Sequence, residues 1–339
     1  MRVGHGPTSR ASISSGGSGG SRAPFRSVMK QLPTGPLVSV VIPTYRRPEA
    51  LARCLDSILG NSYQNVEIVV VDDAADDATQ AIVRDRSRPN LILLVHEIRT
   101  LTAQALNDGI TASHGEILVL TGDDNVLDSN AIAGFVESLS VNPQVAFVGA
   151  LMCYLSSPDL IQTAGAIVTP FTRRMVSIGE NVLDRGQYFR PFDVDLVDGC
   201  IGVRRATLSV TGMVDSHRLP FYHDTASIQF RARASGLRIV LDPRIRVWHD
   251  IPVSQSKTRA LLSPLRAYYM IRSRILLERY YDQPLKAASF AVSIPLYLLS
   301  FTFRALVTDA SAAERWSVFR ALMGGLKDGL MMREGIRPF

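Results

Sequence analysis

The strongest constraint in this sequence is the alternation of apolar runs with helical segments between residues 36 and 124. Four runs have the β-branched, continuous apolar character of buried strands. They fall within residues 38–43, 66–73, 90–97 and 115–124. The segments between them repeat apolar residues at helical spacing over residues 48–61, 79–87 and 102–113. Strands that alternate with helices of this length predict an α/β fold with a mostly parallel, doubly wound sheet.

Polar residues stand at the carboxyl ends of three of these strands, the edge where such sheets bind ligands. The three polar ends are Thr44-Tyr45, Asp72-Asp73 and Asp123-Asp124. Adjacent carboxylates repel each other unless a cation or hydrogen-bond donors occupy the site, so Asp123 and Asp124 indicate a divalent metal ion. The same pair suits a turn or an N-terminal cap before a helix at residues 129–139.

Other site classes lack their characteristic residues. Neither a GxGxxG nor a GxxxxGK[ST] pattern follows any of the strands, so the phosphate-binding glycines of dinucleotide-binding and P-loop proteins are missing. The three cysteines are odd in number and widely spaced, which supports neither a disulfide framework nor a zinc site. A metal ion on carboxylates is then the remaining means of holding phosphate.

Charge is distributed unevenly along the chain. Residues 1–35 carry five basic and no acidic residues, residues 36–250 carry 19 basic and 25 acidic residues, and residues 251–339 carry 13 basic and six acidic residues. This pattern argues against a nucleic-acid groove across the middle segment. It favours binding of the two basic ends to an anionic surface. Because residues 1–35 are also rich in glycine and serine, we predict a disordered basic tail there.

Five segments occur in an order that resembles the family 2 glycosyltransferases of GT-A fold, and the resemblance covers residues 36–250. The segments are VSVVIPTYRRPEALARCLDSIL, VEIVVVDDAADDAT, ALNDGITASHGEILVLTGDDNVLD, VDGCIGVRRATLSVTGMVD and FYHDTASIQFRARASGLRIVLDPRIRVWH. The resemblance implies a GT-A domain that transfers a sugar, with inversion, from a nucleotide-sugar donor to a hydroxyl of a glycan or lipid-linked glycan.

The resemblance also implies roles for particular residues. Asp124 and His249 would bind Mg²⁺ or Mn²⁺, and Asp224 would be the catalytic base that takes the acceptor proton. The expected contacts with the nucleotide-sugar are Pro43, Thr44, Tyr45, Asp72, Asp73, Asn107, Asp123 and Asp198. A loop at residues 169–193 is expected to shape the sugar pocket, and Arg231 and Arg233 are either phosphate contacts or surface charge.

The sequence departs from the family pattern at three positions. Gly122 replaces the first acid of an aspartate triplet, His223 replaces the first acid of a Glu-Asp pair, and Ser227 replaces a further acid. These losses leave open a non-catalytic, glycosyltransferase-like scaffold. A nucleotidyltransferase is the other alternative, although residues 43–50 lack the glycine-rich loop that such an enzyme requires. Asp224 could also serve as a helix N-cap.

Beyond Asp250 we predict a helical, membrane-associating region at residues 251–339. A helix within residues 258–281 would turn Arg266 and Arg274 away from its apolar face. Residues 287–303 lack charge, are near the lower length limit for crossing a bilayer, and are interrupted by Pro295. We therefore favour an interfacial hairpin with the helix at residues 315–332, at the cytoplasmic face of the membrane, over a packed core helix.

Overall fold

The computed structural model describes residues 35–253, 263–282, 284–306 and 311–337. The tail predicted at residues 1–35 lies outside these ranges except for Gly35. The strands are β1 Val38–Thr44, β2 Val66–Asp72, β3 Leu91–Val95, β4 Ile117–Thr121, β5 Asn125–Leu127, β6 Val145–Tyr154, β7 Ser157–Thr163, β8 Ala166–Val168, β9 Met175–Ser177, β10 Phe192–Asp193, β11 Cys200–Arg204 and β12 Arg238–His249. The helices are α1 Pro48–Leu59, α2 Asp77–Asp85, α3 Thr102–Ala112, α4 Ala131–Val141, α5 Leu208–Thr211, α6 Asp224–Ala234, α7 Pro264–Tyr281, α8 Pro284–Leu306 and α9 Ala312–Leu330.

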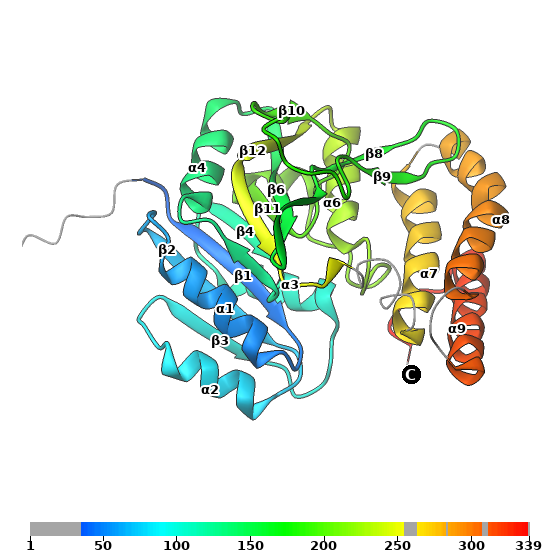
Figure 1. Cartoon of the computed structure of the whole chain (residues 1–339), viewed down its shortest axis with the longest axis horizontal. Helices are drawn as coiled ribbons and strands as arrows, with labels where there is room; N and C mark the ends of the chain where they lie inside the picture. The colour runs from blue at the N-terminus through cyan, green and yellow to red at the C-terminus, as the bar shows by residue number, and fades with distance from the viewer. Residues whose placement is uncertain (1–34, 254–262, 283, 307–310, 338–339) are drawn as a thin grey trace, which may run out of the picture. The chain divides into compact units, whose positions relative to one another are not determined.

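A mixed sheet lies at the centre of the fold, in the order β10-β12-β6-β11-β4-β1-β2-β3 (Figure 1). Strands β3, β2, β1 and β4 are parallel neighbours, as the alternating pattern predicts. The prediction of a mostly parallel sheet is wrong for the second half, because β11 is antiparallel to both β4 and β6. No helix lies between β6 and β11 in the chain, so the crossover that parallel strands require is missing there.

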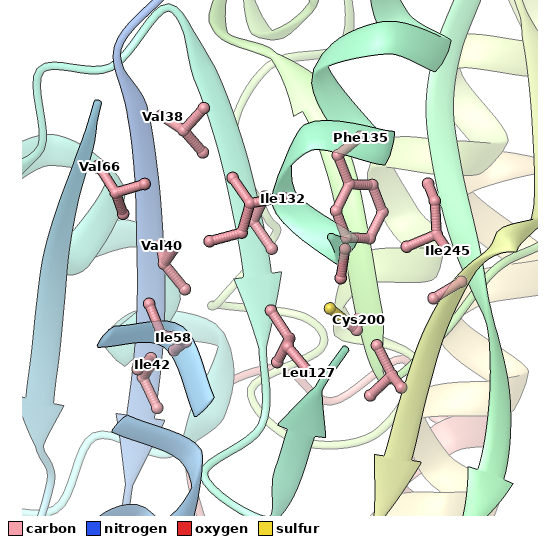
Figure 2. Close-up of a cluster of buried hydrophobic side chains, with 14 of the residues drawn as sticks. Val38, Val40, Ile42, Ile58, Val66, Leu127, Ile132, Phe135, Cys200 and Ile245 are labelled. Atoms are coloured by element: carbon pink, nitrogen blue, oxygen red, sulfur yellow. The ribbon is translucent and has the colours of Figure 1, made fainter. Parts of the chain in front are cut away.

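Helices cover both faces of the sheet. On one face, α1 and α4 bury apolar side chains in one cluster with strands that include β1, β2, β6 and β12, and Figure 2 shows Ile58, Ile132 and Phe135 among the strand residues. On the other face, Leu106 of α3 and Ile228 of α6 belong to a second buried cluster. These two layers hold the carboxyl ends of β1, β2 and β4 at one edge.

The three C-terminal helices pack together and against the sheet domain. Leu276 and Leu277 of α7 share a buried cluster with Phe230 of α6. Residues Thr34–Phe339 form one compact unit, so residue 250 marks a change of architecture within that unit. The three-part division of the chain stays a prediction.

Helix α7 differs from its prediction because residues 271–278 in its middle are buried on all sides. Arg274, predicted to face outward, is only 4% exposed and forms an ion pair of 2.5 Å with Glu278. Glu278 also pairs with Arg173, over 3.1 Å. Among the described helices, none combines the length and apolar character needed to cross a membrane.

Candidate active site

The ends of strands β1 and β4 bring Thr44 and Asp123 together. The strands pair in parallel with Val41 opposite Leu120, so residues three positions further along are neighbours beyond the ladder. The Thr44 hydroxyl donates a hydrogen bond of 2.7 Å to Asp123 Oδ2. Both residues are buried. The carboxyl edge of the sheet therefore carries a fixed acid.

Asp123 lies in a poorly hydrated position. Burial raises its pKa to about 6, and the charge of Asp124 adds to the rise. The Arg47 guanidinium, 3.2 Å from Asp123 Oδ1, opposes this effect. The two aspartates are thus electrostatically coupled, and a nearby cation favours the ionised form of both.

Asp124 is the point at which the side chains of Arg47 and His249 converge. Arg47 Nη1 lies 2.5 Å from Oδ2, and His249 Nε2 lies 3.2 Å from Oδ1. Burial alone would raise the pKa of Asp124, but hydrogen bonds and charge from His249 and Arg47 lower it well below its usual range. Asp124 is therefore the more readily ionised member of the pair.

Strand pairing explains how His249 reaches Asp124 from the other end of the domain. In the antiparallel pairing of β5 with β12, His249 is the register partner of Asn125. The Asp250 N–H donates a hydrogen bond of 2.7 Å to the carbonyl oxygen of Asp124. The predicted metal ligands Asp124 and His249 are thereby adjacent.

The second ring nitrogen of His249 fixes the orientation of the imidazole. Nδ1 lies 2.9 Å from Gln162 Oε1, an amide oxygen that only accepts hydrogen bonds, so Nδ1 carries the proton. Nε2 then faces the Asp124 carboxylate, which is also an acceptor. A shared cation, either a proton or a metal ion, is needed between these two atoms. This geometry suits a divalent ion held by Asp124 and His249.

Few side chains at this site could bind a metal ion. Within the parts of the chain that the structure describes, no group of three or more His, Cys, Asp or Glu side chains is arranged to hold a metal ion. Asp124 and His249 supply one carboxylate and one imidazole, which leaves the remaining coordination positions to water or phosphate oxygens. The residues fit the predicted Mg²⁺ or Mn²⁺, and the nitrogen ligand favours Mn²⁺.

Gly122 replaces an expected acid, and its lack of a side chain gives room to Asp124. A Cβ at position 122 would lie 2.8 Å from Asp124 Oδ1, closer than a nonbonded contact allows. A larger residue would displace the carboxylate from its position beside His249. The departure from the family triplet is thus compatible with the observed place of Asp124.

Asp198 lies in the loop before β11 and belongs to the same edge. Its neighbour Gly199 accepts hydrogen bonds from Gly122 N and Asn125 Nδ2, over 3.3 and 2.8 Å. The Asp198 side chain is open to solvent, yet surrounding protein atoms desolvate it enough to raise its pKa. The Gly199 N–H and the charge of His249 oppose that rise. An accessible but poorly hydrated carboxylate is typical of the floor of a concave site.

Asp224, the predicted base, is the first residue of α6 and is half-buried. Burial raises its pKa to about 7, and the negative charge of Asp198 adds to the rise. A hydrogen bond of 2.7 Å from Thr225 N–H to Oδ1 acts in the opposite direction. The N-cap is His223, so the alternative assignment of Asp224 as the cap is wrong. An acid with a pKa near neutrality is suited to proton transfer.

The backbone before Asp224 is strained. Tyr222 and His223 have φ angles of 61° and 57°, in the left-handed region that non-glycine residues rarely occupy. Burial lowers the pKa of His223 to about 3, and the charge of Arg274 lowers it further. His223 is therefore neutral, and its replacement of an acid spares Asp224 a second neighbouring negative charge.

Helix α7 supports this strained loop from behind. Ser273 Oγ donates a hydrogen bond of 2.8 Å to the carbonyl oxygen of Phe221. The Phe221 ring meets Tyr269 edge-on, with 6.1 Å between the ring centroids. Helices α6 and α7 are neighbours in the fold (Figure 1). The C-terminal region thus contributes to the position of Asp224.

Tyr45, the predicted ring for stacking on the base, is half-buried after β1, in which Pro43 pairs with Val71. Arg99 stands 3.8 Å from the centroid of the Tyr45 ring. Asp73 shapes the loop that carries Arg99, because its carboxylate accepts hydrogen bonds from that loop. The donors are His96, Thr100 and Leu101. Base or ribose contacts by these residues stay predictions.

Asp72 and Asn107 also take part in internal hydrogen bonds. Asp72 is fully buried, and its oxygens accept from the N–H groups of Ala74 and Asp76, over 3.1 and 2.8 Å. The Asn107 amide forms two hydrogen bonds with the backbone of Val214, over 2.8 and 3.1 Å. Both residues hold loops beside the sheet edge, and their predicted contacts with the donor stay predictions.

Arg231 and Arg233 are engaged within the protein. Arg231 donates to the carbonyl oxygen of Met213 and to that of Ser227, the latter over 3.2 Å. Arg233 lies 2.6 Å from Asp195. In the predicted sugar loop, Arg173 is buried against Glu278 of α7, which anchors residues 169–193 to the C-terminal helices.

Sequence reasoning missed Arg47, Gln162 and Arg99. Arg47 was visible in the PTYRRPEA segment, where a cation directly follows the predicted base-binding residues. Gln162 had no local signal, because it reaches His249 only through the pairing of β7 with β6 and of β6 with β12. Arg99 depends on the loop that Asp73 organises.

Comparison with known proteins agrees with this geometry. The family model described as "Glycosyl transferase family 2" matches residues 39–200. Residues 39–200, just under half of the chain, are therefore similar to glycosyl transferase family 2. This segment contains the Thr44, Asp123, Asp124 and Asp198 positions but ends before Asp224 and His249.

A curated relative matches over a shorter length. Glycosyltransferase GlyG of Streptococcus pneumoniae serotype 4 is 35% identical over 115 residues, which is 33% of this chain and 38% of GlyG. The chain thus spans well under half the length of this relative. An uncharacterized glycosyltransferase of Rickettsia typhi is 34% identical over 33% of this chain and 35% of its own length.

A solved structure shares the fold over most of the chain. The mannosyltransferase PcManGT from Pyrobaculum calidifontis, in complex with GDP-Man and Mn²⁺, aligns with a TM-score of 0.56 and 18% identity over 89% of each chain. The GT-A assignment of the sheet domain is therefore confirmed.

Proposed function

We propose that the protein is an inverting glycosyltransferase that moves a sugar from a nucleotide-sugar donor to a hydroxyl of a glycan or lipid-linked glycan. The observation that carries the proposal is the convergence of the Asp124–His249 pair, Asp198 and Asp224 on one sheet edge. The match of residues 39–200 to the family model supports the transferase class. The GDP-Man and Mn²⁺ of the mannosyltransferase complex support a nucleotide-sugar donor and a divalent ion.

In this proposal Asp124 and His249 hold Mg²⁺ or Mn²⁺, and Gln162 keeps the His249 ring in the required orientation. The ion, when bound, supplies positive charge to the diphosphate as it leaves. Thr44 and Tyr45 stand where the nucleotide would lie, beside Asp123. Arg47, which is half exposed, supplies a second positive charge at the same place.

Asp224 supplies the base of the proposed reaction. Its carboxylate removes the proton of the acceptor hydroxyl as that oxygen bonds to the anomeric carbon of the donor. The bond from this carbon to the diphosphate oxygen breaks, and its electron pair leaves with the nucleoside diphosphate. One displacement of this kind inverts the anomeric configuration. Asp198 interacts through its charge with both Asp224 and His249.

The proposed location is the cytoplasmic face of the cell membrane, where a lipid-linked acceptor would be presented. Support comes from the basic balance of residues 251–339 and from the exposed apolar side chains of α8 and α9. No described feature favours a nucleotidyltransferase or a scaffold without activity.

The direct experiment is a thermal-shift screen of UDP-, GDP- and dTDP-sugars with and without Mn²⁺, followed by measurement of nucleoside diphosphate release. We expect one nucleotide class to raise the melting temperature only when Mn²⁺ is present, and to be turned over with a suitable acceptor. Metal-dependent binding without release under any acceptor condition would favour the scaffold. Absence of binding by every donor would contradict the proposal.

A further inference from the structure

The outward face of helix α9 has an unusual composition. Positions recurring at helical spacing on this face are exposed, and four of them are large and apolar. The residues of this α9 surface are Trp316, Phe319, Arg320, Met323, Lys327 and Leu330. The apolar members are between 39% and 60% exposed, although Val318 and Leu322 of the same helix are buried in the packed side. Large apolar groups interleaved with cations are typical of a helix at a membrane interface.

Helix α8 lies beside α9 (Figure 1), and it adds a second exposed apolar face. Leu285, Val292, Leu296 and Leu299 are between 65% and 85% exposed. Phe290 and Ile294, on the opposite side of α8, join the buried cluster with α7 and α9. Soluble monomers rarely expose contiguous apolar areas of this kind, so these faces indicate a partner.

The acids near the α9 surface are already used inside the protein. On α9 itself, Glu314 forms the capping box with Ser311, and Asp328 is buried against Tyr268 and two arginines. Glu278 pairs with Arg173 and Arg274. By contrast, Arg320 and Lys327 form no ion pair with a residue that the structure describes. The α9 surface is therefore positively charged as well as apolar.

A hollow of about 510 Å³ opens between α7 and α9 at this surface. Its walls include Trp316 and Arg320 of α9, Tyr268 of α7, and Arg337. Arg337 is held by Asp328, whereas Arg320 is exposed. Two guanidinium groups beside aromatic rings suit a phosphate group whose attached chain is apolar.

We infer that the α9 surface docks on an anionic lipid bilayer, with a phospholipid phosphate group in the hollow between α7 and α9. A second copy of the chain is the competing occupant of an apolar face. A symmetric dimer through this face would set Arg320 and Lys327 against the same residues of the other copy, and like charges disfavour that contact. The negative surface of a membrane instead complements them.

This inference rests on the membrane location proposed above, for which it names the surface and the lipid chemistry, and it does not depend on the transferase reaction. The test is flotation of the purified full chain with extruded vesicles, without nucleotide or metal. One set of vesicles is pure phosphatidylcholine, and the other contains about a third phosphatidylglycerol. We expect flotation with the anionic vesicles, weaker binding to neutral vesicles, and loss of the anionic preference as salt is raised.

Two double variants separate the contributions of charge and apolar contact. Because each basic side chain near an anionic surface contributes about 1 kcal/mol, or roughly fivefold in affinity, Arg320→Glu with Lys327→Glu should weaken binding to anionic vesicles by tenfold or more. Trp316→Ala with Phe319→Ala should weaken binding to both vesicle types. The matched controls are Arg84→Glu on α2 and Val141→Ala on α4, which are exposed on other helices and should leave binding unchanged.

Three outcomes would overturn the inference. The first is a full-length chain that floats with neither vesicle type. The second is equal binding by the charge-reversed double variant and the controls. The third is a dimer in sedimentation velocity that Trp316→Ala with Phe319→Ala dissociates, without vesicle binding by the parent chain. Loss of donor binding alone would contradict the transferase proposal and leave this inference intact.

Discussion

The guanidinium of Arg47 lies 2.5 Å from the carboxylate of Asp124, on the opposite oxygen from the one that faces His249. Arg47 also lies 3.2 Å from Asp123. It thus provides, from within the chain, part of the positive charge that two adjacent aspartates need. A metal ion on Asp124 and Arg47 compete for the same negative charge, which makes their relationship testable.

We expect Arg47→Ala to strengthen Mn²⁺ binding by the nucleotide-free protein, because the ion no longer has to displace a guanidinium. An exposed ion pair of this kind is worth up to about 1 kcal/mol, so the gain should be about two- to fivefold. Titration of Mn²⁺ followed by electron paramagnetic resonance measures it. Arg53→Ala is the matched control, since Arg53 lies on α1, the helix that Arg47 precedes, and pairs with Asp250. Unchanged affinity in Arg47→Ala would refute the competition.

The roles proposed for Asp124 and Asp224 predict that substitution of Asp124 abolishes donor binding, whereas substitution of Asp224 affects only the chemical step. Asp124→Asn removes a charged oxygen from the metal ion and should abolish metal-dependent donor binding as well as turnover. Asp224→Asn should retain donor and metal binding while turnover falls by roughly 10²–10⁴-fold, the usual scale of general-base catalysis. Calorimetric titration of nucleotide with Mn²⁺, beside a turnover assay, distinguishes them. If nucleotide binding by Asp124→Asn still depends on Mn²⁺, the two aspartates only stabilise a turn.

The position of Gln162 predicts an effect on metal affinity from a residue that contacts the proposed ligand His249 but would not contact the metal ion itself. Gln162→Leu removes the acceptor that orients the His249 ring and should weaken Mn²⁺ binding by roughly 10- to 100-fold. Gln162→Glu keeps an acceptor at this place and should restore the affinity. Both variants should unfold at temperatures close to the parent. Equal Mn²⁺ affinity in the leucine and glutamate variants would mean that Gln162 does not position His249.

The pKa of Asp224, about 7, predicts a pH dependence of turnover. The base must be ionised, so kcat at saturating donor should rise with pH through a midpoint near 7 and level off above it. Removing the negative charge of Asp198 favours the ionised form of Asp224, so Asp198→Asn should move the midpoint to lower pH. A pH–rate profile of both proteins measures the shift. If Asp198→Asn leaves the midpoint unchanged, the charge of Asp198 does not influence the ionisation of Asp224.

Local pattern was sufficient for the first half of the fold. The predicted strands and helices through residue 141 agree with β1 to β4 and α1 to α4 to within a few residues. Apolar periodicity and turn residues determine these elements almost independently of the rest of the chain. The antiparallel direction of strand β11 did not follow from local pattern, because it depends on the connection between β6 and β11, which carries no helical pattern.

The site was predictable only where its residues lie in recognisable segments. Asp123, Asp124 and Asp224 stand at the ends of elements, and the structure brings Asp124 to His249 and couples Asp224 to Asp198. The partners that tune them were not predictable, because strand pairing and helix packing bring in Gln162 and Ser273 from distant parts of the sequence.

Helix α7 shows the same limit in the C-terminal region. Hydropathy treats an arginine as a surface residue, so Arg274 was expected to face outward. Its burial depends on Glu278 one turn later and on Arg173 from a distant loop, and only the folded chain brings these three side chains together. A boundary drawn at residue 250 therefore separates the base-bearing loop from the helix that supports it.

The buried cluster of Arg173, Arg274 and Glu278 allows a test of that support. Glu278→Gln removes the negative charge that two buried arginines share, although Arg173 keeps its ion pair with Asp282. Breaking a buried ion pair on one side typically costs about 3–5 kcal/mol, so the free energy of unfolding should fall by a similar amount. Because α7 contacts the loop before Asp224, turnover should fall together with stability. Urea denaturation and a turnover assay at low temperature measure the two effects.

The control for this prediction is Glu137→Gln. Glu137 also pairs with an arginine, Arg244, but both side chains are at least half exposed. Water and salt screen such a pair, so its loss should change the free energy of unfolding by less than about 1 kcal/mol. Similar small effects for Glu278→Gln and Glu137→Gln would mean that water reaches the Arg173 and Arg274 side chains. The C-terminal helices would then contribute little to the position of Asp224, and a chain ending at Asp250 should keep its donor site.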